Sequence, residues 1–204
     1  MASILQSLNK TITAGVVLTI VLLGIMVSAY DLSFDIDFWR TISRYLHVIS
    51  GVMWIGLLYY FNFVQVPALA GALADEGGPG PAAIGKYVAP RALLWFRMAA
   101  AATWLTGAWA LSISPQYGFI DTFAFQAPEG AMMSLGAWMG TIMLFNVWVL
   151  IWPNQKKVLG IVEASAEEIA KAKFTAAMAS RTNVVLSVPM LLCMIGAGHG
   201  GYLF

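Results

Sequence analysis

The chain is poor in charge and in cysteine, and each shortage excludes a class of protein. Only 10% of its 204 residues are charged, whereas soluble globular domains carry about 25%. Composition therefore argues against a soluble domain. The one cysteine, Cys193, rules out an intrachain disulfide framework and a zinc site built from several cysteines. The formal net charge of +1 gives no basis for binding nucleic acid or another strongly charged partner.

Common catalytic motifs are missing as well. The sequence contains no P-loop and no CxxCH, which excludes a P-loop nucleotide site and covalently attached c-type haem. It has no Ser/His/Asp series and no pair of carboxylates within an apolar segment, so hydrolytic chemistry has no residues to use. The apolar segments hold no Asp or Glu at all, which argues against a proton-coupled transporter.

What the chain has instead is apolar length. Sixty per cent of its residues are hydrophobic, and five apolar runs reach the roughly 20 residues that cross the hydrocarbon core of a bilayer. We therefore expect an all-α integral membrane protein, a single domain formed by a bundle of five transmembrane helices. The expected spans are residues 11–30, 42–66, 92–112, 131–152 and 184–204.

The distribution of charge predicts the orientation. If the five spans alternate across the membrane, nine of the eleven Lys and Arg residues fall on one side, and the other side receives Arg40 and Arg44 with half of the ten carboxylates. Positive charge marks the cytoplasmic side, so we expect a cytoplasmic N-terminus and a periplasmic C-terminus in a bacterial inner membrane. The expected cytoplasmic cations are Lys10, Lys86, Arg91, Arg97, Lys156, Lys157, Lys171, Lys173 and Arg181.

Two segments between the spans have patterns of their own. Residues 67–90 are rich in Gly, Pro and Ala and are typical of a connector. The segment 165–180 begins with Ser165 and Glu168, which are spaced as a capping box. Its mixture of apolar and lysine side chains predicts an amphipathic helix on the cytoplasmic surface. We interpret the sequence as free of internal repeats.

The only two histidines, His47 and His199, are the main candidates for a functional site. Imidazole readily binds haem iron or another metal, and the expected topology places both near the periplasmic ends of their spans. A hydrogen bond to interfacial water is the alternative for His47. For His199, which glycines surround, the alternative is a frayed helix end that faces water. A shared ligand requires the second and fifth spans to be neighbours.

Small and aromatic residues near the histidines suggest where a flat cofactor would lie. Gly51 is one helical turn from His47, Trp54 is about two turns from it, and Gly196 precedes His199 on the last span. We expect the two histidines to be axial ligands of one b-type haem, with the two glycines at the floor of a slot and Trp54 beside it. The same glycines also suit close helix packing without a cofactor.

Polar residues at the other ends of the spans are interpreted separately. Arg97 lies inside the boundary of the third span, where a guanidinium favours a carboxylate, a propionate or a lipid phosphate. Alternatively, its side chain extends to the cytoplasmic headgroups. Asn146 and residues 180–183 are interpreted as polar cross-links between helices, with a substrate or quinone pocket as the alternative.

Four groups of residues, in order between about residue 40 and residue 199, match a known pattern. They are His47–Gly56, Trp95–Arg97 with Thr103–Gly107, Asn146–Trp148 with Trp152–Lys157, and Ser180–Asn183 through Pro189 to His199. Together they resemble the membrane domain of the bacterial urate oxidase (urate hydroxylase) family, here without its C-terminal cytochrome c domain. The resemblance implies a multi-span membrane domain whose family members oxidise urate and pass electrons to cytochrome c.

The resemblance and the two histidines lead to one expectation and two alternatives. We expect a membrane redox protein, an oxidoreductase subunit if it is an enzyme, with haem b near the periplasmic face. Its expected partners are membrane lipid and a periplasmic electron carrier such as cytochrome c. The first alternative is a cofactor-free structural or accessory subunit of a larger membrane complex. The second, metal binding by the two histidines alone, conflicts with the three or four protein ligands that stable sites usually need.

Overall fold

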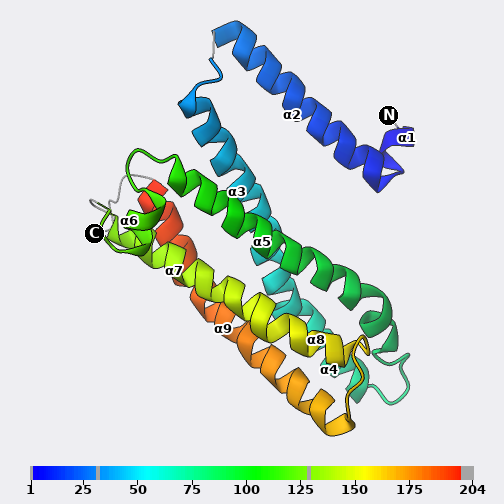
Figure 1. Cartoon of the computed structure of the whole chain (residues 1–204). Coiled ribbons are helices and arrows are strands. Elements are labelled where there is room, and N and C mark those ends of the chain that lie inside the picture. Colours follow the sequence, from blue (N-terminus) through cyan, green and yellow to red (C-terminus); the bar gives the residue numbers. More distant parts are fainter. Residues whose placement is uncertain (1, 31–32, 128–129, 199–204) are drawn as a thin grey trace. The chain divides into compact units, whose positions relative to one another are not determined.

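The computed structural model describes residues 2–30, 33–127 and 130–198, and the regular structure in this part of the chain is entirely helical (Figure 1). The all-α fold expected from the sequence is confirmed. The chain divides into two compact units, of which the first ends at Ile42 and the second begins at Ser43. The first unit holds α1 (Ala2–Leu5), α2 (Leu8–Tyr30) and the start of α3 (Ile36–Tyr59).

Asp35 caps the start of α3. Its carboxylate accepts hydrogen bonds from Ser33 Oγ at 2.6 Å and from the main-chain N–H groups of Asp37 and Phe38 at 3.0 and 3.2 Å. These bonds, the one from Ser33 foremost, hold the pKa of Asp35 below its usual value. The cap satisfies main-chain donors that the helix itself leaves unpaired and so defines where α3 begins.

The second unit is a bundle of long helical stretches, two of which have a π-helical segment between two α-helices. The first stretch is α3 followed by η1 (Tyr60–Gln65) and α4 (Val66–Ala74), and the other is α7 (Ala131–Phe145) followed by η3 (Asn146–Ile151) and α8 (Trp152–Val158). Between and after them lie η2 (Ile84–Val88), α5 (Ala89–Ser112), the short α6 (Phe119–Phe123) and α9 (Ala166–Gly198).

Four helical stretches of the described residues are long and apolar enough to cross a membrane. They are Leu8–Tyr30, Ile36–Ala74, Ala131–Val158 and Ala166–Gly198. They correspond to four of the five expected spans and indicate a multi-pass membrane protein. The remaining expected span, 92–112, forms α5, which has 24 residues but carries Arg91 and Arg97 and is not among the four.

Each π-helical segment ends two residues before a proline. The residue before Pro67, Pro90 and Pro153 donates its N–H to a carbonyl five residues earlier, in the π register. Proline has no N–H, and its ring crowds the carbonyl four residues earlier. The wider π turn accommodates this crowding, and the helix continues. Residues 67–74, which the sequence predicts to be part of a connector, are therefore helical.

The last helix also differs from expectation. The sequence predicts a surface helix at 165–180 and a separate span at 184–204, whereas α9 is one continuous helix. No Gly or Pro stands between residues 166 and 188 to interrupt it. The predicted capping box is confirmed, because Ser165 Oγ accepts the N–H of Glu168 at 3.2 Å and the Glu168 carboxylate accepts the N–H of Ser165 at 2.9 Å.

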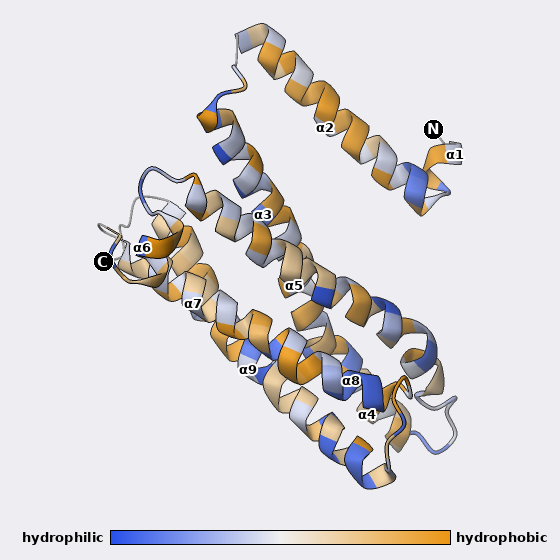
Figure 2. Cartoon of the chain, in the orientation of Figure 1, coloured by the Kyte–Doolittle hydropathy of each residue, from blue (hydrophilic) through white to orange (hydrophobic). Residues whose placement is uncertain are grey.

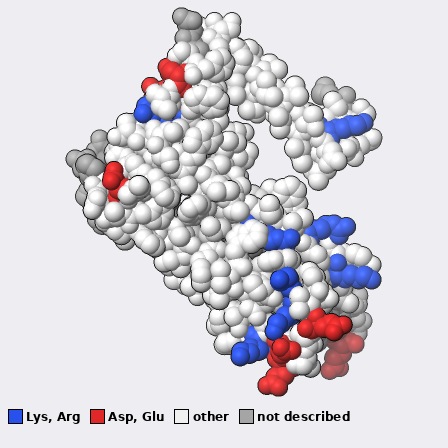
Figure 3. Space-filling view, in the orientation of Figure 1, with Lys and Arg blue, Asp and Glu red and all other residues white. Residues whose placement is uncertain are grey.

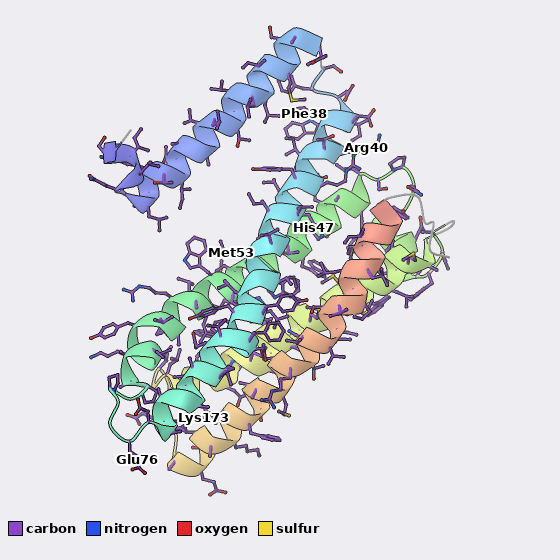
Figure 4. All side chains as sticks on the ribbon, turned by 180° about the vertical axis from the view of Figure 1, so that it is seen from behind. Phe38, Arg40, His47, Met53, Glu76 and Lys173 are labelled. Carbon is purple, nitrogen blue, oxygen red and sulfur yellow. The ribbon has the colours of Figure 1, made fainter. Side chains whose placement is uncertain are left out.

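The two ends of the second unit differ in charge. Hydrophilic side chains and most cations gather where α4 connects to η2 and α8 connects to α9 (Figures 2 and 3). We call this the basic end; Glu76 and Lys173, labelled in Figure 4, lie there. The opposite end, where α6 connects α5 to α7, we call the His47 end.

A close contact between α7 and α9 helps to hold the bundle together. A Cβ atom at Gly136 of α7 would lie 3.0 Å from Cε of Met194 and 3.2 Å from Cβ of Cys193, both on α9. The absence of a side chain at Gly136 therefore lets the two helices approach closely, as small residues do in membrane proteins.

Candidate functional site

His47 is held in place by a hydrogen bond between α3 and α5. Its Nδ1 atom lies 2.8 Å from the main-chain oxygen of Thr103 (Figure 4 labels His47). Because a carbonyl oxygen can only accept, Nδ1 carries the hydrogen of this bond, and Nε2 of the neutral ring carries none. Metal-binding histidines are commonly oriented in this way, by donating one ring N–H to a main-chain carbonyl. The bond therefore leaves Nε2 as the atom that could bind a metal.

Glycines make room for the imidazole where α3 meets α5. A Cβ atom on Gly107 would lie 2.8 Å from both Cε1 and Nδ1 of His47, which is closer than a side chain could be placed without movement. Gly51, one turn along α3 from His47, also faces α5, because a Cβ there would lie 3.7 Å from Cγ2 of Thr103. The site around His47 is thus formed by α3 and α5.

The other predicted site residues lie elsewhere. Trp54 is 2% exposed, belongs to the hydrophobic core, and its indole N–H has no acceptor in the described part of the chain. Gly196 is buried near the end of α9. His199 lies outside the described residues. The structure therefore places Gly51 beside the Thr103 contact of His47 and Trp54 in the core.

The second and fifth expected spans are neighbours. The hydroxyl groups of Tyr59 in α3 and Ser187 in α9 lie 2.9 Å apart, and Nδ2 of Asn62 in η1 donates to Ser180 Oγ of α9 at 2.8 Å. Both contacts are on the basic-end side of His47. They meet the requirement that these two helices touch, although the direct contacts of His47 itself are with α5.

A buried asparagine joins α9 to the other interrupted stretch. Asn183 is completely buried; its Nδ2 donates to the main-chain oxygen of Met143 at 3.0 Å, and its Oδ1 accepts from Nδ2 of Asn146 at 2.8 Å. Such hydrogen bonds cross-link helices where no water competes. The interpretation of Asn146 and residues 180–183 as polar cross-links is confirmed for this pair and for Ser180.

A repeated motif escaped the sequence analysis. The pattern Ser-x3-Trp-x-Gly-x4-Phe-Asn occurs in both interrupted stretches, and in each it leads into a π-helical segment and a proline. Arg97 and Arg181, on the helices that follow the two copies, are separated by the same number of residues in the sequence as the two members of each motif pair. The pairs are Ser50 and Ser134, Trp54 and Trp138, Gly56 and Gly140, Phe61 and Phe145, and Asn62 and Asn146.

The two copies of the motif have different surroundings. Trp54 and Phe61 are 2% and 9% exposed, whereas Trp138 and Phe145 are 43% and 55% exposed. The first copy thus contributes its aromatic side chains to the core, and the second presents them at the surface of this unit. The spaced Trp, Gly, Phe and Asn were the signal that could have revealed the repeat.

The apolar helices and the polar contacts between them define a multi-pass α-helical membrane protein. The model of the urate oxidase N-terminal family matches residues 114–204, which include α6 to α9. This match supports the resemblance inferred from the sequence over the part of the chain that it covers, which holds the last two of the four groups of residues. His47 lies outside the matched residues. No curated protein and no solved structure matches the chain.

Proposed function

We propose that this chain is the membrane part of a redox protein of this family, in which His47 binds haem iron through Nε2. The observation that carries the proposal is the hydrogen bond from Nδ1 of His47 to the Thr103 carbonyl, which holds the ring in the tautomer that a metal ligand needs. A haem b bound there would supply a one-electron carrier within the membrane.

The described residues fit this role in part. Gly107 leaves the space that the imidazole occupies, and hydrogen bonds join the stretch that carries His47 to α9, which ends one residue before His199 in the sequence. His199 is the proposed second axial ligand, with Gly196 close before it in the sequence. We assign Gly51 and Trp54 to the support of α3, since both are packed toward protein.

We further propose five spans, with α5 as the third. α5 contacts α3 through His47, and the indole N–H of Trp104 donates to Thr141 Oγ1 of α7 at 2.9 Å. With five alternating spans, the basic end faces the cytoplasm of a bacterium by the positive-inside rule. The His47 end then faces the periplasm, where the proposed electron exchange with a carrier such as cytochrome c would occur.

A difference spectrum tests the proposal. The detergent-purified chain is measured as dithionite-reduced minus oxidised, beside His47→Ala, His199→Ala and the control Ser50→Ala, one turn from His47 on α3. We expect a b-type signal in the wild type and control and its loss in both histidine variants. A folded wild type without the signal would contradict the proposal and favour a cofactor-free accessory subunit. Loss in His47→Ala alone would exclude His199 as the second ligand.

A further inference from the structure

Arg97 of α5 lies against Trp152, the first residue of α8. Its guanidinium carbon is 3.7 Å from the centroid of the indole, a cation–π contact between the two helices. Arg97 is half-buried and lies about 12 Å along α5 from Ala89, at about 1.5 Å per residue. The stacking orients the guanidinium, which distinguishes Arg97 from a side chain that simply extends into solvent.

Neither side chain has a hydrogen-bond acceptor in the described part of the chain. Arg97 forms no hydrogen bond and no ion pair with the described residues. The two described ion pairs join Arg40 to Asp37 and Lys157 to Glu168. The indole N–H of Trp152 likewise donates to none of the described residues. A guanidinium presents five N–H donors, and leaving such donors half-buried without a partner is costly. The pair therefore lacks an acceptor.

The carboxylates that the structure describes in the second unit do not provide that acceptor. Those of the second unit that the structure describes lie in connections, in the short α6 or at the start of α9, and Glu168 is bonded to Lys157 and Ser165. They are Asp75, Glu76, Asp121, Glu163, Glu167 and Glu168. The missing partner must come from outside these residues, and an anion with several oxygens suits a guanidinium best.

The surroundings of Arg97 favour a lipid as the source of that anion. Leu94, one turn before Arg97 on α5, is 45% exposed, and Trp95 and Met98 of the same part of α5 are 59% and 50% exposed, so α5 presents apolar surface at the level of Arg97. Lys156, one turn beyond Trp152 on α8, adds positive charge toward the basic end. We propose that Arg97 and the indole N–H of Trp152 bind the phosphate of an anionic membrane lipid whose acyl chains lie along α5. This site does not depend on the haem proposal.

Thermal unfolding of the detergent-purified full chain tests this site. The unfolding midpoint is measured during titration with phosphatidylglycerol, with phosphatidylcholine and with inorganic phosphate. We expect the unfolding midpoint to rise to saturation with phosphatidylglycerol only. In Arg97→Gln the concentration for half of the rise should increase about tenfold or more, because hydrogen bonds to a charged group are lost. Trp152→Phe keeps an aromatic ring but removes the indole donor, and should give a smaller increase.

Arg181→Gln is the matched control. Arg181 has the equivalent position on α9, is exposed, and its substitution makes the same change in net charge. The control should respond to phosphatidylglycerol as the wild type does. An unchanged response in both Arg97→Gln and Trp152→Phe would overturn the proposal, as would an equal response to phosphatidylcholine. A rise with inorganic phosphate that requires Arg97 would replace the lipid by a free anion.

Discussion

The imidazole of His47 occupies the space that a side chain on Gly107 would need. A Cβ atom there would be 2.8 Å from two ring atoms, while the same ring bonds to the Thr103 carbonyl one turn earlier on α5. A glycine and a main-chain acceptor on α5 thus determine where the only described histidine lies. The orientation of this ring therefore depends on α5 as well as on α3.

Replacement of Gly107 by alanine should displace His47. The new Cβ cannot coexist with the ring in its present position, so the bond to Thr103 should lengthen or break, at a cost of about 1–3 kcal/mol in stability. Thermal unfolding in detergent measures this cost, and haem content measures the effect on the proposed site. Gly56→Ala on α3 is the control, because a Cβ there meets no atom within 4 Å. Equal stability of the two variants would contradict the described packing.

Alanine at Gly136 and at Gly140 should have opposite effects. At Gly136 the added Cβ meets Cys193 Cβ at 3.2 Å, so α7 and α9 must separate, with an expected loss of about 1 kcal/mol. At Gly140 nothing lies within 4 Å, and alanine should stabilise α7 by up to about 1 kcal/mol through its higher helix propensity. The difference in unfolding midpoint between the two variants checks the register of α7 on α9.

Substitution of Asn183 by alanine should weaken the contact between α7 and α9. It removes the acceptor of the buried Asn146 amide, which is left unpaired, at a cost of about 1 kcal/mol or more. It also removes a donor to the Met143 carbonyl, which keeps the hydrogen bond from the main-chain N–H of Asn146. Thr182→Ala is the control, since this exposed hydroxyl bonds only to Met178 of its own helix. Asn183→Ala with wild-type stability would show that the asparagine pair does not form.

Tyr59→Phe should cause a small loss of stability, because it weakens the contact between α3 and α9. The variant removes the hydroxyl that bonds to Ser187 but keeps the ring. The expected loss in the free energy of unfolding is about 0.6 kcal/mol, the average contribution of such a hydrogen bond in a membrane protein. Tyr60→Phe, at the next residue, removes a hydroxyl for which the structure describes no partner. A double variant with Ser187→Ala should show that the Tyr59 and Ser187 effects are not additive.

Apolar length predicted the helices well, and local signals predicted their ends less well. Hydrophobic runs of about 20 residues revealed all of the long helices, and the capping box at Ser165 correctly marked the start of α9. Pro67 was misleading, because the sequence gives no sign that a π turn accommodates the proline. Lysines near residue 171 suggested a surface helix, yet α9 continues through residues 181–183, where no Gly or Pro interrupts it.

The candidate site was predictable in chemistry but not in its contacts. A histidine in an apolar helix was recognisable as unusual from sequence alone. Its partners on α5 were not, because Thr103 contributes a main-chain oxygen and Gly107 contributes only space, and neither feature leaves a specific pattern. The contacts of Asn62 and Asn146 depend on how the π segments turn these residues toward α9, which only the packed helices reveal.

Haem titration of the purified chain shows whether His47 binds haem iron. Haemin is added in steps to wild type, His47→Ala and Ser50→Ala, and the Soret band records binding. We predict saturation at one haem per chain with a spectrum of bis-histidine ligation in wild type and Ser50→Ala, and no saturable binding in His47→Ala. Equal binding by His47→Ala and wild type, or no saturable binding by a folded wild type, would contradict this prediction.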